Sequence, residues 1–382
     1  MYQPYDHQQE VIKATIDKLK HKKSVLIQAS TGFGKTIVSA CLVDHYLEQG
    51  KRILFVVDSE DLISQTSSSF IKNGIINEGI TSRVKRPKHF ADCYVAMVET
   101  LNNRLSDNPN FLKNIDLVIS DEAHILVHEK IYKFFPGAKI IALTATPIIM
   151  KRLTFFKCDI CGTEHQENTN CCGIETMEWT KPYTMSQIYD DIVVGKPIDW
   201  LIEHGYLCKD ISLVRKSVDT SGLKKDSSGD FSNKSQNHAF GAPESITALV
   251  NDYKEICQGK KTLIFTPSTK INKMVVAEFE GQGIDARSFD TRHNSKKERI
   301  PTLKWFRSNR DAILINTGCF IKGLDVTDIE AIIGYLSTDS LSKYIQFVGR
   351  GGRPTKNIFK DSFIHLDYGE NIDRLGEWSD PT

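Results

Sequence analysis

Eight residues that follow a short apolar run have the types and spacing of a phosphate-binding loop. The segment ASTGFGKT (29–36) lies between the β-branched run SVLIQ and a helical pattern, with Ala29 where the general pattern has glycine. Glycines let backbone N–H groups turn toward an anion, a lysine can reach the β- and γ-phosphates, and a threonine hydroxyl can ligate Mg²⁺. A chance glycine turn ending in Lys-Thr is the alternative, which the strand–loop–helix context disfavours. We expect ATP and Mg²⁺ to be bound by Ser30, Thr31, Gly32, Phe33, Gly34, Lys35 and Thr36, with Thr36 as a metal ligand.

Two adjacent carboxylates, Asp121 and Glu122, end the apolar run DLVIS. An aspartate at the carboxyl end of a strand can hold Mg²⁺, largely through its water shell, and a neighbouring glutamate can polarise the attacking water. Two neighbouring acids alone are usually a solvated turn. Their position at the end of a buried strand, downstream of a phosphate loop, favours hydrolysis of the bound nucleotide.

Short β-branched runs recur along the chain, each followed by a segment of helical character. Continuous apolar runs that alternate with helices predict parallel strands buried on both faces of a sheet. The sequence therefore predicts an α/β fold with helices covering parallel sheets. The expected strands are 24–29, 52–58, 93–98, 116–122, 139–146, 261–267, 312–317, 331–336 and 362–367, and 37–49 is expected to be helical.

A length of 382 residues is sufficient for two domains with separate cores. Two stretches interrupt the strand–helix pattern: 155–180 contains a cysteine cluster and little strand or helix signal, and 216–243 is rich in Ser, Lys, Asp, Asn and Gly. The second composition is typical of an exposed connection. We expect a first domain over 1–205 that includes the cysteine-rich insert, a polar connection over 206–243, and a second domain over 244–382.

Further motifs follow the phosphate loop in a fixed order. The first half contains VVDSEDLISQ (56–65), MVETL (97–101), DEAH (121–124) and TAT (144–146), and the second half contains KTLIFTP (261–267), a segment over 317–326 and QFVGRGGR (346–353). Each motif alone is weak, but together and in this order they make the chain resemble superfamily 2 helicases of the DEAH type. Within that superfamily it resembles phage branch-migration helicases of the phage T5 type.

The resemblance implies two RecA-like domains that hydrolyse ATP at the cleft between them. It implies further nucleotide contacts from Gln8, which would read the adenine, and from Gly323 and Asp325. An arginine that acts on the γ-phosphate is worth roughly 10³–10⁵ in rate, and the resemblance expects Arg350 and Arg353 on a helix for this role. The implied catalytic residues are Lys35, Asp121, Glu122, Gln346, Arg350 and Arg353. The implied coupling residues are His124, Thr144, Ala145 and Thr146.

The resemblance also implies a nucleic-acid partner, which we expect to be forked or branched DNA. Polar groups that contact phosphates position a strand without reading its sequence, and the candidates are Gln65, Thr100, Thr266 and Thr317. The alternatives are the motor subunit of a restriction system, an RNA helicase and, in a different class, a nucleic-acid-binding scaffold without ATPase activity. The intact Lys35, Asp121 and Glu122 argue against the scaffold.

Four cysteines, Cys158, Cys161, Cys171 and Cys172, lie within fifteen residues of one another. The Cys-x-x-Cys-Gly spacing of the first pair is that of a zinc knuckle, and four thiolates can complete a tetrahedral zinc site. The second pair is adjacent, so His165 could replace one member. Free buried thiols and a redox pair are the alternatives. The remaining cysteines are scattered singly, as expected for buried thiols in a reducing compartment.

A net charge of +1 restricts any nucleic-acid surface to a local groove, because the chain as a whole does not attract a polyanion. The N-terminal segment lacks the pattern of a signal peptide, and no window contains 18 uninterrupted apolar residues. We therefore expect a monomer in the cytoplasm, of the bacterial host if a phage encodes the chain, and no membrane partner.

Overall fold

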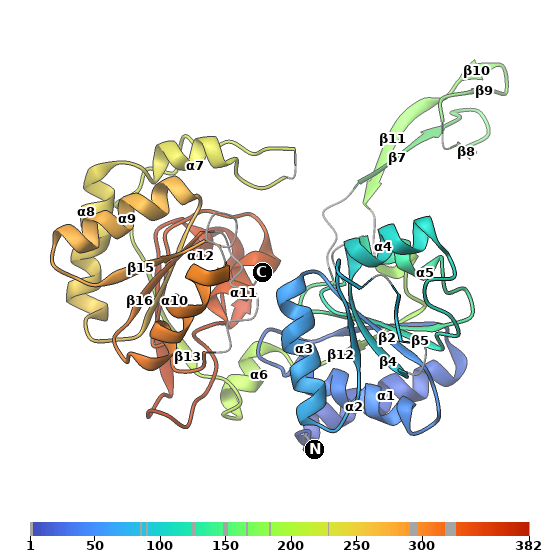
Figure 1. Cartoon of the computed structure of the whole chain (residues 1–382). Coiled ribbons are helices and arrows are strands. Elements are labelled where there is room, and N and C mark those ends of the chain that lie inside the picture. The colour runs from blue at the N-terminus through green and yellow to red at the C-terminus, as the bar shows by residue number, and fades with distance from the viewer. Residues whose placement is uncertain are drawn as a thin grey trace. The chain divides into compact units, whose positions relative to one another are not determined.

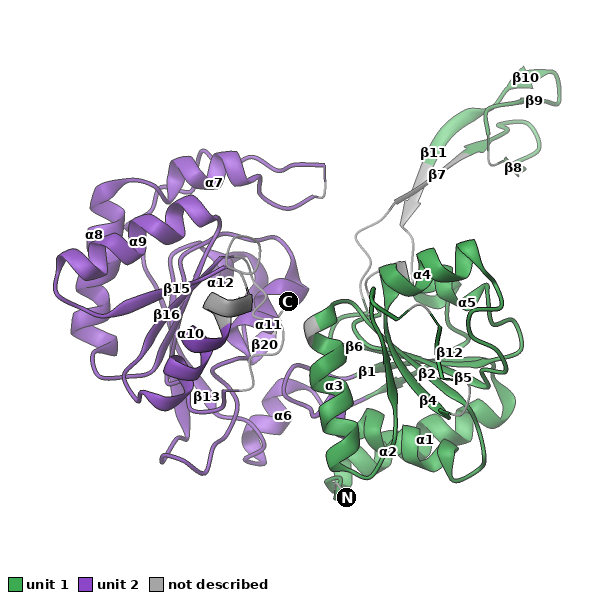
Figure 2. Cartoon of the chain, in the orientation of Figure 1, with its two compact units in different colours: residues 1–28, 38–194 green, residues 29–37, 195–382 purple. Residues whose placement is uncertain are grey.

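The computed structural model describes residues 3–84, 86–88, 91–123, 127–147, 152–165, 167–182, 185–227, 229–290, 296–317 and 326–381. These residues form two compact units (Figure 2). Unit 1 comprises Met1–Gln28 with Val38–Val194, and unit 2 comprises Ala29–Ile37 with Gly195–Thr382. Three of the expected site residues, His124, Gly323 and Asp325, lie outside the described residues.

Unit 1 is built on a seven-stranded sheet in the order β12-β1-β6-β5-β2-β4-β3, and all its paired strands are parallel. Helices lie on both sides of this sheet (Figure 1). The interior strands β2 and β5 are buried along their whole length, and β1, β4 and β6 along all but one end residue, as the continuous apolar runs predict. The strands are β1 (Ser24–Gln28), β2 (Ile53–Val57), β3 (Glu78–Ile80), β4 (Cys93–Met97), β5 (Leu117–Ser120), β6 (Lys139–Thr144) and β12 (Asp191–Val194). The helices are α1 (Asp6–His21), α2 (Lys35–Leu47), α3 (Glu60–Lys72), α4 (Val98–Asp107) and α5 (Val127–Tyr132).

Between β6 and β12 the chain forms an antiparallel ribbon, residues 152–182, which we call the cysteine ribbon (Figure 1). Its long strands, β7 (Arg152–Lys157) and β11 (Met177–Pro182), pair along their whole length. Short strands at its distal end are β8 (Glu164–His165), β9 (Asn170–Cys171) and β10 (Ile174–Glu175). The little strand signal over 155–180 is explained by the ribbon's form, because its regular structure comes from antiparallel pairing of β7 with β11 and not from strands buried in a sheet.

Unit 2 contains a second parallel sheet, in the order β13-β18-β17-β14-β16-β15. One face is covered by α8 and α9, whose side chains Leu249 and Val275 join the same buried cluster as Ile264 and Ile333 of the sheet. The strands are β13 (Lys209–Val214), β14 (Thr262–Thr266), β15 (Ala286–Phe289), β16 (Ile313–Thr317), β17 (Ala331–Gly334) and β18 (Ser362–Asp367). The helices are α6 (Ile198–Glu203), α7 (Asn233–Ala239), α8 (Pro243–Asp252), α9 (Thr269–Gly281), α10 (Lys296–Ser308), α11 (Leu341–Val348) and α12 (Asn371–Leu375). The predicted α/β fold with helix-covered parallel sheets is confirmed.

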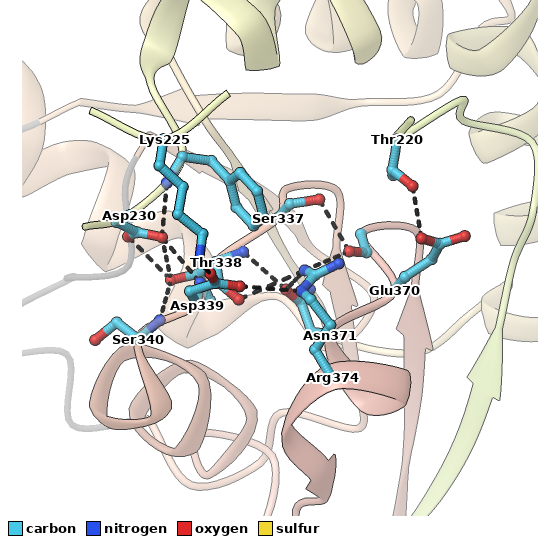
Figure 3. Close-up of polar contacts among 12 residues, drawn as sticks. Thr220, Lys225, Asp230, Ser337, Thr338, Asp339, Ser340, Glu370, Asn371 and Arg374 are labelled. Carbon is cyan, nitrogen blue, oxygen red and sulfur yellow. Dashed lines mark hydrogen bonds and ion pairs between the residues drawn. The ribbon is translucent and has the colours of Figure 1, made fainter. Parts of the chain in front are cut away.

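The stretch 206–243, expected as a polar connection, contributes β13 and α7 and is fixed to unit 2 by a polar cluster (Figure 3). Asp230 accepts hydrogen bonds from Thr338 Oγ1 at 3.0 Å and Asp339 N at 2.9 Å, and pairs with Lys343. Burial alone would raise the pKa of Asp230, but Lys343 and the Asp339 amide hold it below its ordinary value. A composition rich in Ser, Lys and Asp therefore forms an ordered polar contact here.

Among the described residues, no helix combines the length and apolar character needed to cross a bilayer.

Candidate active site

The phosphate-loop motif lies in the turn between β1 and α2. β1 ends at Gln28 and α2 begins at Lys35, so the motif's lysine opens the helix. Gly32 has φ 87° and Gly34 has φ 91°, the left-handed conformation that side chains disfavour. Hydrogen bonds from Phe33 N to Ser30 O (3.1 Å) and from Ile37 N to Gly34 O (2.8 Å) hold the two tight turns. This backbone can present N–H groups to an anion at a helix N-terminus.

The side chains of the loop are ordered by burial and by one lysine contact. Phe33 is 1% exposed and anchors the loop, while Lys35 Nζ lies 3.4 Å from the carbonyl oxygen of Ala29. The hydroxyl of Thr31 is buried and has no hydrogen-bond partner among the described residues. An unsatisfied donor in a glycine-rich cradle fits a polar ligand with several acceptor oxygens, such as a nucleotide phosphate.

Asp121 and Glu122 follow β5 directly and are held in a constrained turn. Asp121 N donates to Val56 O at 3.0 Å, and Ala123 N donates to Leu143 O at 2.8 Å, so neighbouring strands fix both ends of the turn. Glu122 has φ 51°, which costs a non-glycine residue of order 1–3 kcal/mol. Its amide donates to Asp121 Oδ1 at 3.0 Å. The strained glutamate is typical of a functional position.

The strand order relates this turn to the phosphate loop. β6 lies between β1 and β5, and all three strands run parallel. Their carboxyl ends are therefore at the same edge of the sheet, which is where open α/β sheets bind ligands. The phosphate loop follows the carboxyl end of β1, and Asp121 and Glu122 follow the carboxyl end of β5. The topology thus places the phosphate loop and Asp121, the predicted magnesium ligand, at one edge of the sheet.

Three of the predicted coupling residues, Thr144, Ala145 and Thr146, lie at the carboxyl end of β6, the strand between β1 and β5. Thr144 Oγ1 donates to Thr146 O at 2.9 Å and accepts from Thr146 N at 3.2 Å, which closes a local turn. Both threonines and Ala145 are buried. The turn is therefore rigid and lies at the carboxyl edge between the two candidate catalytic segments, and its coupling role stays a prediction.

Gln8, the predicted adenine-reading residue, is 2% exposed in the first turn of α1. Its Oε1 accepts from the backbone N–H of Tyr5 at 3.0 Å, as in a helix-capping box. The side chain therefore has a structural contact that fixes its orientation at the start of α1. A role toward the nucleotide base remains a prediction.

The structure corrects the placement of the two arginines. α11 ends at Val348, so Arg350 and Arg353 lie in the turn after the helix rather than on it. Gly349 caps α11, and the amide of Gly351 donates to Val348 O at 2.9 Å, which continues the chain as a tight turn. Gln346 remains within α11, where its Nε2 donates to Ser342 Oγ at 3.3 Å. Turn residues can direct arginine side chains away from the helix surface.

Lys360 fixes this turn, and sequence reasoning missed it. Its Nζ donates to Arg353 O at 2.9 Å and to Thr327 O at 3.1 Å. Burial lowers the pKa of Lys360 to about 8, because removal from water disfavours the charged ammonium. The residue lies in the polar segment KNIFKDS, whose composition gives no signal of a half-buried lysine.

The two glycines between the arginines are required by packing. A Cβ on Gly352 would overlap the buried indole ring of Trp378, and one on Gly351 would overlap the ring of Phe363. Neither ring can move freely, since Trp378 is 0% and Phe363 is 2% exposed. The turn carrying the arginines is thereby seated directly on the core of unit 2.

We expect Gly352→Ala to destabilise the protein by about 1–3 kcal/mol, the usual effect of overpacking a well-filled core. The measurement is the midpoint of urea unfolding, followed by the fluorescence of the tryptophans. Gly222→Ala is the matched control, because a Cβ there meets nothing within 4 Å. Equal midpoints for the two variants would show that Trp378 does not constrain the turn.

The four predicted nucleic-acid contacts differ in exposure. Gln65 is exposed on α3 and Thr100 is half-buried on α4. Thr266 is 0% exposed and its hydroxyl donates to Asn316 O on the neighbouring strand β16 at 3.1 Å, and its phosphate contact stays a prediction. The hydroxyl of Thr317 is buried and has no partner among the described residues, and its contact with a nucleic acid stays a prediction.

A second candidate site lies on the cysteine ribbon, where the sulfur atoms of Cys158, Cys161, Cys171 and Cys172 all lie within 4.8 Å of one another. His165, the alternative ligand, is not part of this cluster.

Two family models match the chain. Residues 1–149 match the model described as type III restriction enzyme, res subunit, and residues 244–355 match the helicase conserved C-terminal domain. The chain is 27% identical over 325 residues to a 51.5 kDa protein of Lactococcus phage (isolate 7-9), which covers 84% of this chain and 61% of that protein. It is 24% identical over 368 residues to the Saccharomyces cerevisiae protein named "Putative ATP-dependent helicase IRC3", covering 91% of this chain and 49% of that one. The chain thus spans less than two thirds of both relatives.

Solved structures show the same fold. A fragment of "a putative HsdR subunit of a type I restriction enzyme from Vibrio vulnificus YJ016" superposes with a TM-score of 0.72 at 20% identity, over 99% of this chain and 66% of that one. Dbp5 of S. cerevisiae, bound to RNA and ADP BeF3, superposes with a TM-score of 0.59 at 12% identity, over 97% of this chain and 90% of that one. The predicted pair of RecA-like domains is confirmed by these likenesses.

Proposed function

We propose that this chain, which its two family matches indicate to be a superfamily 2 helicase, is an ATP-driven translocase that moves along DNA. Helicase domains imply a nucleic-acid-dependent ATPase, and DNA as the track is the finer proposal. We place its preferred substrates among forked or branched duplexes, as in the phage branch-migration helicases that the motifs resemble. The observation that carries the ATPase part is the phosphate loop and the Asp121–Glu122 turn at one edge of a single parallel sheet.

The chemistry follows from the residues at that edge. Lys35 and the loop amides neutralise the β- and γ-phosphates, and Glu122 orients and polarises the attacking water. Mg²⁺, held by Thr36 and Asp121, would neutralise charge that develops on the phosphate oxygens. Arg350 and Arg353 would add the remaining positive charge. Because phosphoryl transfer needs little covalent help, positioned charges and donors of this kind are what the reaction requires of the protein.

Support for DNA comes from the restriction-type neighbours. The model that matches residues 1–149 is described as a restriction-enzyme subunit, and the HsdR fragment superposes with a higher TM-score than RNA-bound Dbp5. A further neighbour, the ATP-dependent Type ISP restriction-modification enzyme LlaBIII, is bound to DNA in its solved structure and superposes with a TM-score of 0.63 at 16% identity. The same observations favour the motor subunit of a restriction system as the first alternative.

An RNA helicase is the second alternative, and a sequence match to an RNA helicase supports it. The chain is 24% identical over 387 residues to the RNA helicase DBP8 of Mycosarcoma maydis, a match that covers 92% of this chain. Contacts to phosphates alone do not separate DNA from RNA, since that distinction depends on the 2′-hydroxyl.

The test is ATP hydrolysis measured against one strand sequence presented as single-stranded DNA, duplex, fork, four-way junction and single-stranded RNA. We expect stimulation to be greatest for the fork and the junction and weakest for RNA, because branched DNA offers duplex and single-stranded arms together. A mock preparation from cells that do not express the chain, assayed in parallel, reports any contaminating ATPase. Equal stimulation by RNA and branched DNA would contradict the DNA assignment and leave the ATPase site unaffected.

A further inference from the structure

We propose that the cysteine ribbon binds one structural Zn²⁺ ion through the thiolates of Cys158, Cys161, Cys171 and Cys172. The site is separate from the nucleotide chemistry, and the proposal does not depend on which nucleic acid the motor follows.

The sulfur atoms have the spacing that a tetrahedral ion requires. A zinc ion with bonds of about 2.3 Å to four sulfurs places those sulfurs roughly 3.8 Å apart. The Sγ atoms of Cys161 and Cys171 are 3.6 Å apart, and those of Cys171 and Cys172 are 4.0 Å apart. A disulfide needs about 2.05 Å, so these sulfurs are not bonded to one another. All four lie within 4.8 Å of one another, and a cluster of four fits a metal cage better than a redox pair, which uses two thiols.

The backbone explains how two adjacent cysteines can serve one ion. Successive residues of a strand direct their side chains to opposite faces, so Cys171 and Cys172 would diverge in an extended chain. Cys172 instead has φ 53°, in the turn that joins β9 to β10. The left-handed conformation is costly for a cysteine and persists where the surroundings impose it. Here it brings both thiols into the cluster.

The distal part of the ribbon has no apolar core of its own. Among the described residues from 158 to 176, only Cys158 and Thr176 are buried. The apolar side chains in this segment face solvent, with Ile160 64% and Ile174 37% exposed. A segment that buries so little cannot offset its conformational entropy, and metal binding is the usual source of folding free energy in such modules.

The alternative of free buried thiols does not fit these positions. Cys161 and Cys172 are exposed, and Cys171 is half-buried. Four protein ligands also leave no open coordination position, so the ion is structural and not catalytic.

The charge of the ribbon indicates that the ion does not serve to hold DNA phosphates. Between Arg152 and Pro182 the basic residues are Arg152, Lys157 and Lys181, whereas the acidic residues are Asp159, Glu164, Glu167, Glu175 and Glu178. An ion with four thiolates adds further negative charge. Loss of the metal should therefore change affinity for single-stranded DNA by less than about twofold, since counterion release depends on basic contacts.

The experiment is elemental analysis of the purified full-length chain, together with a variant carrying Cys158→Ser and Cys161→Ser. We expect one zinc per wild-type chain and none in the double variant. Cys41→Ser, outside the ribbon, is the matched control and should retain the metal. Replacement of zinc by Co²⁺ should give the intense sulfur-to-cobalt absorption of a four-thiolate tetrahedral site.

A second measurement keeps the proposal testable if the serine variant misfolds. Treating the wild-type chain with a chelator should make the 152–182 segment sensitive to protease, and added Zn²⁺ should restore resistance. Metal-free wild-type protein with a protease-resistant ribbon would overturn the proposal, as would zinc retained by the double variant. Failure of DNA to stimulate hydrolysis would refute the proposed function while leaving the zinc stoichiometry unchanged, so the two failures are distinguishable.

Discussion

Replacing Glu122 with glutamine is expected to lower the rate of ATP hydrolysis by about 10²–10⁴-fold, the usual contribution of a positioned general base. Glutamine preserves the shape of the side chain and the strained turn at φ 51°, but its amide cannot accept a proton from water. Nucleotide binding should persist, because the phosphate loop is unchanged. The measurements are single-turnover hydrolysis with saturating DNA and the affinity for a fluorescent ATP analogue.

Lys35→Ala provides the opposite pattern, because it removes the charge that reaches the β- and γ-phosphates and should weaken binding together with turnover. Glu99→Gln is the matched control, since Glu99 is an exposed glutamate in the first turn of α4. It should hydrolyse ATP at the wild-type rate. Near-wild-type turnover in Glu122→Gln would remove the catalytic role from the turn after β5.

The strands that the sequence predicts are the interior strands of the two sheets. β1, β2, β4, β5 and β6 in unit 1, and β14, β16, β17 and β18 in unit 2, all have a neighbour on each side. Burial on both faces demands continuous apolar residues, which is the signal that the runs carry. The strands that went undetected, β3, β12, β13 and β15, are the edges of those sheets, and each is partly exposed. The sequence KDISLV of β13 is therefore predicted to be part of a polar connection, because its pairing with β18 is not evident from the sequence.

The parts of the candidate site that form a contiguous sequence motif could be predicted. The side-chain contacts that depend on tertiary packing could not. The phosphate loop and the Asp121–Glu122 pair are contiguous and end apolar runs, so their position on strands follows from the sequence. The buried side chain of Thr266 could not be inferred, because its hydroxyl bond to Asn316 O joins residues 50 positions apart. The same holds for Lys360, whose bond to the carbonyl of Arg353 exists only when the turn is folded.

The turn after α11 also shows why a motif can be recognised before its geometry is understood. QFVGRGGR suggests a helix bearing two arginines, but α11 ends at Val348 and is capped by Gly349, before Arg350. Gly351 and Gly352, which follow Arg350, fit against Phe363 and Trp378. With the turn seated on the core and held by Lys360, the backbone around the arginines loses little entropy when a ligand binds. Such preorganisation is what electrostatic stabilisation of a transition state requires.

Arg350→Ala should accordingly leave nucleotide affinity within roughly tenfold while lowering hydrolysis by at least about 10³-fold, the magnitude of an arginine that neutralises charge on the transferring phosphoryl group. The charge on the γ-phosphate oxygens and the leaving oxygen changes as the bond breaks, so a guanidinium directed there contributes more to the transition state than to the bound ground state. Separate measurement of affinity and single-turnover rate tests this difference.

The control for Arg350→Ala is Lys356→Ala, an exposed cation in the same region, which should change neither quantity. The unfolding midpoint should also stay at the wild-type value, because the Gly351 and Gly352 contacts that seat the turn remain intact. A parallel loss of affinity and turnover would place Arg350 in ground-state binding, and a lowered midpoint would place it in folding. A selective loss of rate is the single outcome that assigns it to the transition state, since neither a structural nor a binding role produces that pattern.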